Sequence, residues 1–200
     1  MSVMEHIEIG RVLRASTEGF TCGTRSQEIH QPSLGAFVQT RHADSALIVI
    51  GLITAIRIHD DPLVRQLIMA SNMDESTLRD QRENRLVPVE IEVLSIGYIE
   101  DDQPRYNLPP RPPLSLDPVL LCVPDEITYF TQEPDFLRLI LNAHNIAATD
   151  LIGATVRKAA DARPDGLREQ FLIEAGRYLA GLLSHDLVML QHILKMIRPT

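Results

Sequence analysis

The most continuous run of apolar residues in this chain of 200 residues lies within residues 33–60. Its pattern predicts a strand over residues 34–41, a short polar turn at 42–44 and a second strand over 46–59. A strand of about 14 residues exceeds the usual length of about 5–6, so it has to bend. Gly51 interrupts the second strand near its middle, where a glycine often marks a bulge or a barrel corner. We therefore expect a small β-barrel at the centre of the protein.

Alternating apolar and polar positions predict further strands over residues 7–15, 20–24, 86–99 and 119–123. Polar turns separate these segments, a spacing that is typical of a β-barrel or β-sandwich. Pro88 cannot donate a ladder hydrogen bond, so the strand that contains it begins there or lies at a sheet edge.

After residue 123 the apolar positions recur with the period of an α-helix. Helices are predicted to start near Asp125 and Pro134, and to cover residues 150–162, 167–183 and 187–197. The side chains that we expect to cap three of these helices are Asp125, Thr149 and Ser184.

These patterns predict an α+β protein in which an N-terminal small antiparallel β-barrel is followed by a C-terminal α-helical bundle. The expected domains are a barrel over residues 1–123 and a helical domain over residues 124–200. Residues 61–85 form an expected helical excursion from the barrel, because apolar positions recur at helical spacing after Pro62.

The last two predicted helices carry more apolar residues than one face of a helix needs. These residues either form a bundle with the apolar positions of residues 136–141, or they seal an interface between subunits. The sequence leaves both alternatives open.

A proline-rich block covers residues 106–118. Its four central prolines cannot continue a β-ladder, so the block is expected to be extended, with polyproline character. The main interpretation is a stiff strap across the barrel surface. The alternative is a ligand for an SH3-type partner, because the letters PPRPP at residues 109–113 resemble such ligands.

The composition is that of an ordinary globular protein, with 44% hydrophobic and 23% charged residues. Cys22 and Cys122 form no C-x-x-C pair, so we expect two reduced thiols. Residues 1–12 lack the pattern of a signal peptide, and the apolar run over 46–56 is shorter than the ~20 residues of a membrane-spanning helix. We expect a cytoplasmic protein without a membrane partner.

Motifs for catalysis are weak throughout the sequence. The segment GATVRK at residues 153–158 is the nearest match to a P-loop. It lacks the second glycine of that motif and the hydroxyl residue that follows the lysine. His185 and His192 are seven positions apart, whereas metal-binding pairs on a helix prefer three or four. A site in a cleft that uses His59 or His144 is supported by residue type alone. We therefore expect no enzyme, and no catalytic, cofactor-binding or metal-binding residue.

Basic residues offer an alternative function in nucleic-acid binding. The candidate contacts lie on predicted barrel segments, and they are Arg11, Arg14, Arg25, Arg41 and Arg57. The formal net charge of −8 and the absence of a basic run in the sequence disfavour this partner.

Four stretches together resemble a known family. They are IGRV at residues 9–12, LGAFVQT at 34–40, VIGLITAI at 49–56 and the proline-rich segment at 109–127. The region from about residue 7 to residue 127 is similar to the HAS barrel, a small β-barrel that HerA-type DNA translocases share with F-type ATP synthase subunits. In the translocases a P-loop ATPase core follows the barrel, whereas a predicted helical segment without a Walker motif follows here.

The resemblance implies ring assembly or the docking of partners onto a ring, and it carries over no catalytic residue. The predicted function is a non-enzymatic assembly or adaptor protein in DNA processing. Its expected partner is a second copy of the chain, or a protein of the ring-ATPase or nuclease type. The candidate partner-binding residues are Arg11, Arg14, Leu187, Leu190 and Leu194.

Overall fold

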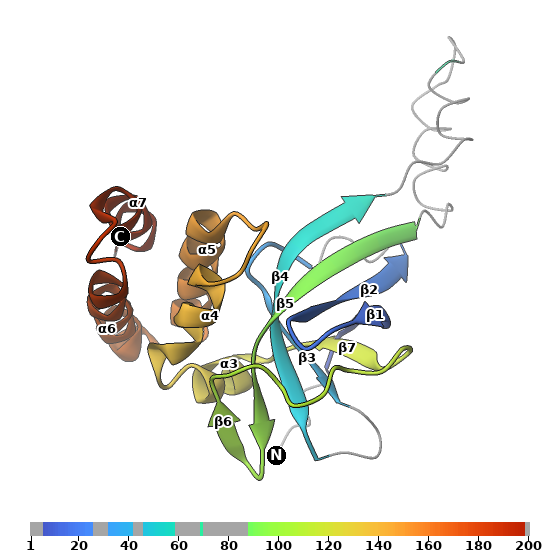
Figure 1. Ribbon diagram of the computed structural model, residues 1–200. Helices are drawn as coiled ribbons and strands as arrows, with labels where there is room; N and C mark the ends of the chain where they lie inside the picture. The colour runs from blue at the N-terminus through green and yellow to red at the C-terminus, as the bar shows by residue number, and fades with distance from the viewer. Residues whose placement is uncertain (1–5, 26–31, 42–45, 59–68, 70–87, 199–200) are drawn as a thin grey trace, which may run out of the picture.

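The computed structural model describes residues 6–25, 32–41, 46–58, 69 and 88–198 (Figure 1). The predicted turn at residues 42–44 and nearly all of the predicted helical excursion at 61–85 lie outside the described residues.

The described residues form seven antiparallel strands, of which six close into a barrel. The strands are β1 (Glu8–Ala15), β2 (Gly19–Arg25), β3 (Phe37–Arg41), β4 (Ile48–Ile58), β5 (Pro88–Glu100), β6 (Gln103–Arg105) and β7 (Pro118–Leu121). Around the barrel they follow the order β2-β1-β7-β3-β4-β5, and pairing of β2 with β5 closes the ring. The short β6 pairs with the end of β5 beyond the ring. The predicted barrel and the α+β class are thus confirmed.

The long strand β4 bends in the way that its central glycine predicts. Its register against β5 shifts between Ile50 and Gly51 and again between Ile53 and Ala55. A Cβ atom at Gly51 would lie 2.3 Å from Cγ1 of Val93, so no larger residue fits at this approach of the two strands. Because β4 turns there, it can contact β5 along the whole of its length while both strands curve around the barrel.

Helices follow the last strand. They are α3 (Pro124–Phe130), the 3-10 turn η2 (Pro134–Phe136), α4 (Leu137–Leu141), α5 (Ala148–Asp161), α6 (Asp165–Leu182) and α7 (Leu187–Ile197). The helix predicted from Pro134 is therefore a 3-10 turn that leads into a short α-helix.

The three predicted caps are wrong. Helix α3 starts one residue before Asp125, and the carboxylate of Glu126 accepts the backbone N–H of Val123 at 2.9 Å. Helix α5 includes Thr149, and its N-cap is Ala147. Helix α7 is capped by Asp186, whose Oδ1 accepts the Met189 N–H at 2.9 Å. A cap depends on where the chain turns into the helix, which the apolar period fixes only to within a few residues.

The barrel wall separates two apolar cores. One fills the barrel, and its buried members include Val12, Phe20, Val38, Ile53 and Val93. The other lies between the outer barrel face and the helices, which all lie on one side of the barrel (Figure 1).

Strand β3 contributes to both cores because its side chains alternate. Val38 belongs to the barrel interior, whereas Phe37 meets Phe136 edge to face with ring centroids 6.1 Å apart. The helices therefore pack directly on the barrel.

Helix α5 lies between the barrel and α7, which it contacts on its far side. On the barrel side, Gly35 has φ +72°, and a Cβ there would lie 2.9 Å from Cβ of Ala154. Lys158 Nζ donates to Ser33 Oγ at 2.9 Å in the same contact. On the other side, Arg157 Nε donates to the Met196 carbonyl at 2.5 Å. These contacts fix α7 relative to the barrel through α5.

Candidate protein-binding surface

Helix α7 buries one face and exposes several apolar side chains elsewhere on its surface. Leu190, Ile193 and Ile197 follow each other at helical spacing and are buried against the other helices. On the opposite face Leu187 is 62% exposed and Val188 is 81% exposed. Apolar side chains therefore lie on two sides of this helix, and the described residues cover those of one side.

The three leucines that were predicted to bind a partner differ in their exposure to solvent. Leu187 and Leu194, with exposed fractions of 62% and 38%, lie at the surface. Leu190 has an exposed fraction of 9% and packs in the core with α5 and α6, so it is unavailable to a partner in this structure. The apolar run alone could not assign these residues, because apolar positions occur on both sides of α7.

Helix α6 also carries both buried and exposed apolar side chains. Phe171, Ala175 and Leu179 are buried, whereas Leu167 and Ile173 are exposed. Leu194 of α7 lies over Gly176 of α6, where a Cβ would be 3.4 Å away, so the two helices pack directly.

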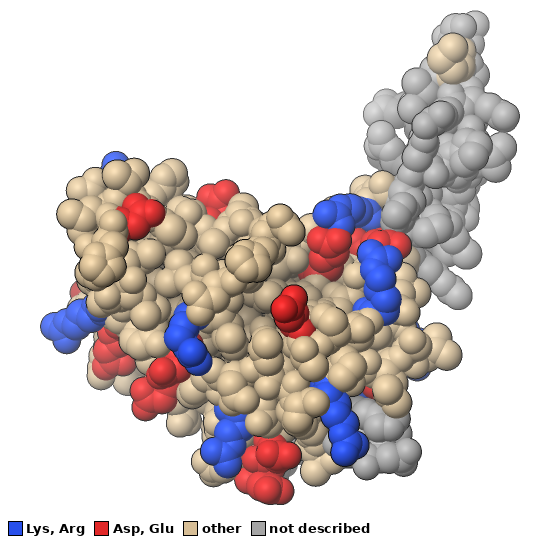
Figure 2. Space-filling view, in the orientation of Figure 1, with Lys and Arg blue, Asp and Glu red and all other residues tan. Residues whose placement is uncertain are grey.

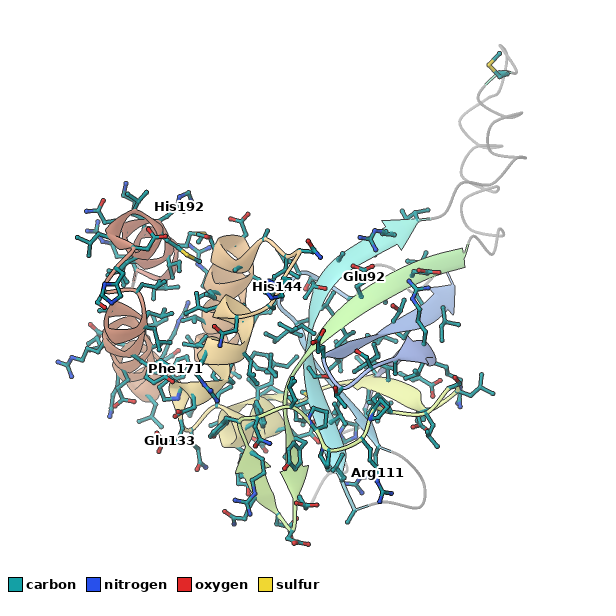
Figure 3. All side chains as sticks on the ribbon, in the orientation of Figure 1. Glu92, Arg111, Glu133, His144, Phe171 and His192 are labelled. Carbon is teal, nitrogen blue, oxygen red and sulfur yellow. The ribbon has the colours of Figure 1, made fainter. Side chains whose placement is uncertain are left out.

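Figure 3 shows Phe171 at the inner side of α6, next to the other helices. It also shows His192 on α7, where the side chain is exposed. His185 is exposed too, in the turn between α6 and α7.

The candidate barrel arginines contact carboxylates of the barrel. Arg14 Nη2 lies 3.1 Å from Glu90 Oε2, and Arg57 forms an ion pair with Glu92. Arg11 Nε lies 3.0 Å from Glu8 Oε1, and its Nη1 donates to the Leu116 carbonyl at 3.1 Å.

Of the two remaining candidate arginines, only Arg41 has a described side chain. Arg41 is exposed at the end of β3, and the side chain of Arg25 lies outside the described residues. On the face shown in Figure 2, Lys and Arg side chains alternate with Asp and Glu and do not gather. Among the described candidate arginines, Arg11, Arg14 and Arg57 thus each have their charge balanced by a neighbouring carboxylate.

An open groove of about 490 Å³ lies where the β1–β2 hairpin and β5 approach the loop before α5. Its lining combines apolar residues such as Phe20 and Leu94 with Arg14, Glu18 and Glu92, and Ile146 contributes from the loop before α5. Arg14 and Glu92 are already engaged in the ion pairs described above.

His144 is not among the described residues that line this groove. His144 lies in the exposed loop before α5 (Figure 3), and His59 lies outside the described residues. Among the described residues, no three His, Cys, Asp or Glu side chains form a group that could hold a metal ion.

A polar cluster that the sequence did not indicate joins the N-terminal segment to α3. His6 Nε2 lies 2.9 Å from Glu126 Oε1, while Glu126 Oε2 accepts the Val123 N–H. Burial raises the pKa of Glu126, but hydrogen bonds from His6, Gln39 and Val123 outweigh it and hold the pKa below its ordinary value of 4.5. The cluster is a helix cap with a long-range contact, and it offers no open position for a substrate.

Both cysteines are free thiols, of which Cys22 is buried and Cys122 is half-buried. Burial raises the pKa of Cys22 to about 12 and raises the pKa of Cys122 as well. A nucleophilic cysteine needs the thiolate, which is scarce at neutral pH when the pKa is raised.

The proline-rich block forms a strap whose end is fastened to β1. Val12 N–H donates to the Asp117 carbonyl at 3.0 Å, and Leu116 N–H donates to the Val12 carbonyl at 2.8 Å. Pro109 and Pro113 are buried, so each of the PxxP pairs 109/112 and 110/113 has one buried member. An SH3 groove grips both prolines of a pair, which favours the strap over the SH3 ligand.

None of the described helices is both long enough and apolar enough to cross a membrane. A comparison with protein-family models and with curated proteins finds no match to this chain. The similarity to the HAS barrel therefore stays a prediction, and the contacts above are the basis for a functional proposal.

Proposed function

We propose that this chain is a non-enzymatic assembly or adaptor protein that binds another protein chain through the outer face of α7. The observation that carries this proposal is the exposure of Leu187, Val188 and Leu194 on a helix whose opposite side is already buried. Fully burying a side chain of this kind is worth about 1.5–3 kcal/mol, so an interface that covers them gains substantial free energy. Apolar clusters at a protein surface commonly mark binding sites.

In this proposal the barrel is a HAS-type platform, and the helices form a bundle that carries the contact surface. The closed six-stranded barrel supports the first part, and the direct packing of α5 against α6 and α7 supports the second. The protein works in the cytoplasm, on a second copy of itself or on a ring ATPase or nuclease that processes DNA. The HAS-barrel resemblance is the reason for naming this class of partner.

The test is absolute mass by light scattering on a size-exclusion column, together with binding to a purified HerA-type ATPase. We expect an assembly heavier than the 22.4 kDa chain, or a stable complex with the ATPase. The double substitution Leu187→Asp and Val188→Asp should abolish it. Leu114→Asp with Leu116→Asp, at two other exposed leucines, is the matched control and should leave it unchanged. A monomer that binds no such ATPase contradicts the proposal.

Nucleic-acid binding through the barrel arginines is the alternative function, and no contact among the described residues favours it. Arg11, Arg14 and Arg57 each have a carboxylate neighbour. The discriminating measurement is DNA binding as a function of salt, because phosphate contacts give a steep salt dependence.

A further inference from the structure

The groove of about 490 Å³ beside the loop before α5 lies over the seam that closes the barrel. Its floor comes from four strands that are neighbours around the ring, in the order β1-β2-β5-β4. Thr21 of β2 is paired with Arg14 of β1 and with Glu92 of β5, so these three side chains lie on one face of the sheet. The loop before α5 reaches toward these strands (Figure 1) and contributes Ile146. We call this hollow, which these residues line, the seam groove.

Two irregularities of the sheet border the seam groove. One register shift, in β1, ends at Arg14, and another, in β4, falls at Thr54. Both residues line the groove, and Oγ1 of Thr54 donates to the Glu92 carbonyl at 3.2 Å. A β-bulge redirects the side chains around it and is common beside functional sites. The two shifts thus favour a binding site over an incidental gap between side chains.

The charges in the seam groove are unbalanced. Arg14 and Glu92 are already engaged in ion pairs, with Glu90 and Arg57 respectively. Glu18 lies in the turn between β1 and β2, is exposed, and forms no ion pair with any of the described residues. One carboxylate of the lining is therefore left over, and a positively charged group on a ligand complements it.

Apolar side chains form the rest of the lining. Leu94 of β5 and Ile146 are half-buried, and the buried Phe20 and Val93 contribute as well. Gly19, which follows Glu18, is paired with Leu94, so the unpaired carboxylate and the apolar part of the groove are adjacent. The volume lies within the range of ~300–1,000 Å³ that is usual for ligand sites. Because the groove is open, an extended chain can lie across it.

From this combination we infer that the seam groove binds a segment of another polypeptide that carries a lysine or arginine next to an apolar side chain. The basic group pairs with Glu18, and the apolar side chain packs against Leu94 and Ile146. A nucleic acid would instead bring its phosphates toward an unpaired carboxylate, which repels them. The inference goes beyond the proposed function, because the seam groove shares no residue with α7.

The chemistry of the ligand can be tested by selecting binders from a library of random short peptides on the immobilised full chain. The chain carries Leu187→Asp and Val188→Asp, so that the exposed apolar side chains of α7 do not compete for apolar peptides. We expect the enriched peptides to share a lysine or arginine beside an apolar residue. Enrichment of acidic peptides, or no enrichment at all, overturns the inference.

The position of the site can be tested by reversing the charge of Glu18. Its backbone N–H donates to Ser16 Oγ and its carbonyl accepts the Ser95 N–H, so a change of side chain leaves these bonds intact. We expect Glu18→Lys to weaken binding of an enriched peptide about fivefold, measured by fluorescence anisotropy. The loss should shrink as salt is added. Glu169→Lys, at an exposed position of α6, makes the same change in charge and should have no effect.

The apolar part of the site is tested separately with Ile146→Asp, in the loop before α5. We expect this variant to lose the enriched peptide as well, because a carboxylate replaces an apolar contact. Circular dichroism shows whether each variant is folded. A peptide that binds the wild type, Glu18→Lys and Ile146→Asp equally well overturns the inference.

These outcomes are independent of those for the proposed function. A chain that assembles through Leu187 and Val188 but selects no basic peptide overturns the inference and leaves the proposed function in place. A chain that selects basic peptides through Glu18 but forms no assembly supports the inference and contradicts the proposed function.

Discussion

Glu126 connects three parts of the chain through one carboxylate. It accepts the backbone N–H of Val123, lies against His6, and receives a hydrogen bond from Gln39 of β3. Because its folded-state pKa is below the ordinary value, the carboxylate stabilises the fold when it is ionised. That contribution is complete above pH 4.5 and is lost as the pH falls through the lowered pKa of the folded state.

We predict that Glu126→Gln lowers the free energy of unfolding by about 1 kcal/mol at neutral pH, as is typical for a weakened cap. The difference from the wild type should vanish well below pH 4.5, where both side chains are neutral. Urea unfolding at several pH values measures it. Glu169→Gln, at an exposed position of α6, is the control and should change little. A difference that persists in acid would contradict the assigned role of the charge.

A second residue-scale prediction concerns Cys22 and Cys122. Since burial raises the pKa of both thiols, we expect neither to react with a thiol reagent at neutral pH while the protein is folded. Both should react once the chain is unfolded in denaturant. A Gln191→Cys variant, whose added thiol lies at an exposed position of α7, supplies a fast-reacting positive control. Rapid modification of Cys22 in the folded wild type would mean that the barrel interior opens readily, whereas Cys122 packs against the core outside the barrel.

At the scale of single elements, the bend of β4 depends on the absence of a side chain at Gly51. A Cβ there would come within 2.3 Å of Val93 Cγ1 and 3.0 Å of the Leu94 carbonyl. By contrast, a Cβ at Gly181 of α6 would have nothing within 4 Å. These two glycines therefore allow a matched comparison of the same substitution.

We predict that Gly51→Ala destabilises the protein by about 1–3 kcal/mol, because the added methyl group forces β4 and β5 apart. Gly181→Ala should stabilise it by about 0.5–1 kcal/mol, since alanine is the better helix former. Thermal or urea unfolding measures both. Equal effects of the two substitutions would argue against a tight approach at Gly51.

At the scale of the whole molecule, the barrel wall supports two cores at once. Phe37, Ile50, Leu52 and Ile96 of the barrel belong to the same apolar cluster as the buried residues of α5, α6 and α7. Removing the helices would expose this outer wall to water. A division of the chain at residue 123 would thus pass through the outer core and leave apolar side chains of both parts uncovered.

We predict one cooperative unfolding transition for the full chain, in which barrel and helices are lost together. A fragment of residues 1–123 should be insoluble or bind a hydrophobic dye strongly, because its outer barrel wall is uncovered. Circular dichroism at helix and strand wavelengths during unfolding measures the first point. Two well-separated transitions, or a soluble folded fragment, would show that the barrel is independent of the helices.

Several features of the fold follow from the sequence alone. The apolar pattern located six of the seven strands and missed the short β6, and Gly51 marked the bend in β4, because both signals depend on neighbours along the chain. The proline-rich block at residues 106–118 predicted the strap for the same reason. The N-caps were missed, since Ser184 and Asp186 are two residues apart and both are good caps.

Tertiary structure decided what depends on contacts between distant segments. Closure of the barrel requires β2 to pair with β5, which joins Gly19 to Leu94, and no local pattern encodes that pairing. It also decided which apolar residues of α7 are covered: Leu190 packs against α5 and α6, while Leu187 remains at the surface. The sequence determined that α7 is an apolar helix, and the packing of α5 and α6 against it determined which side was left to bind a partner.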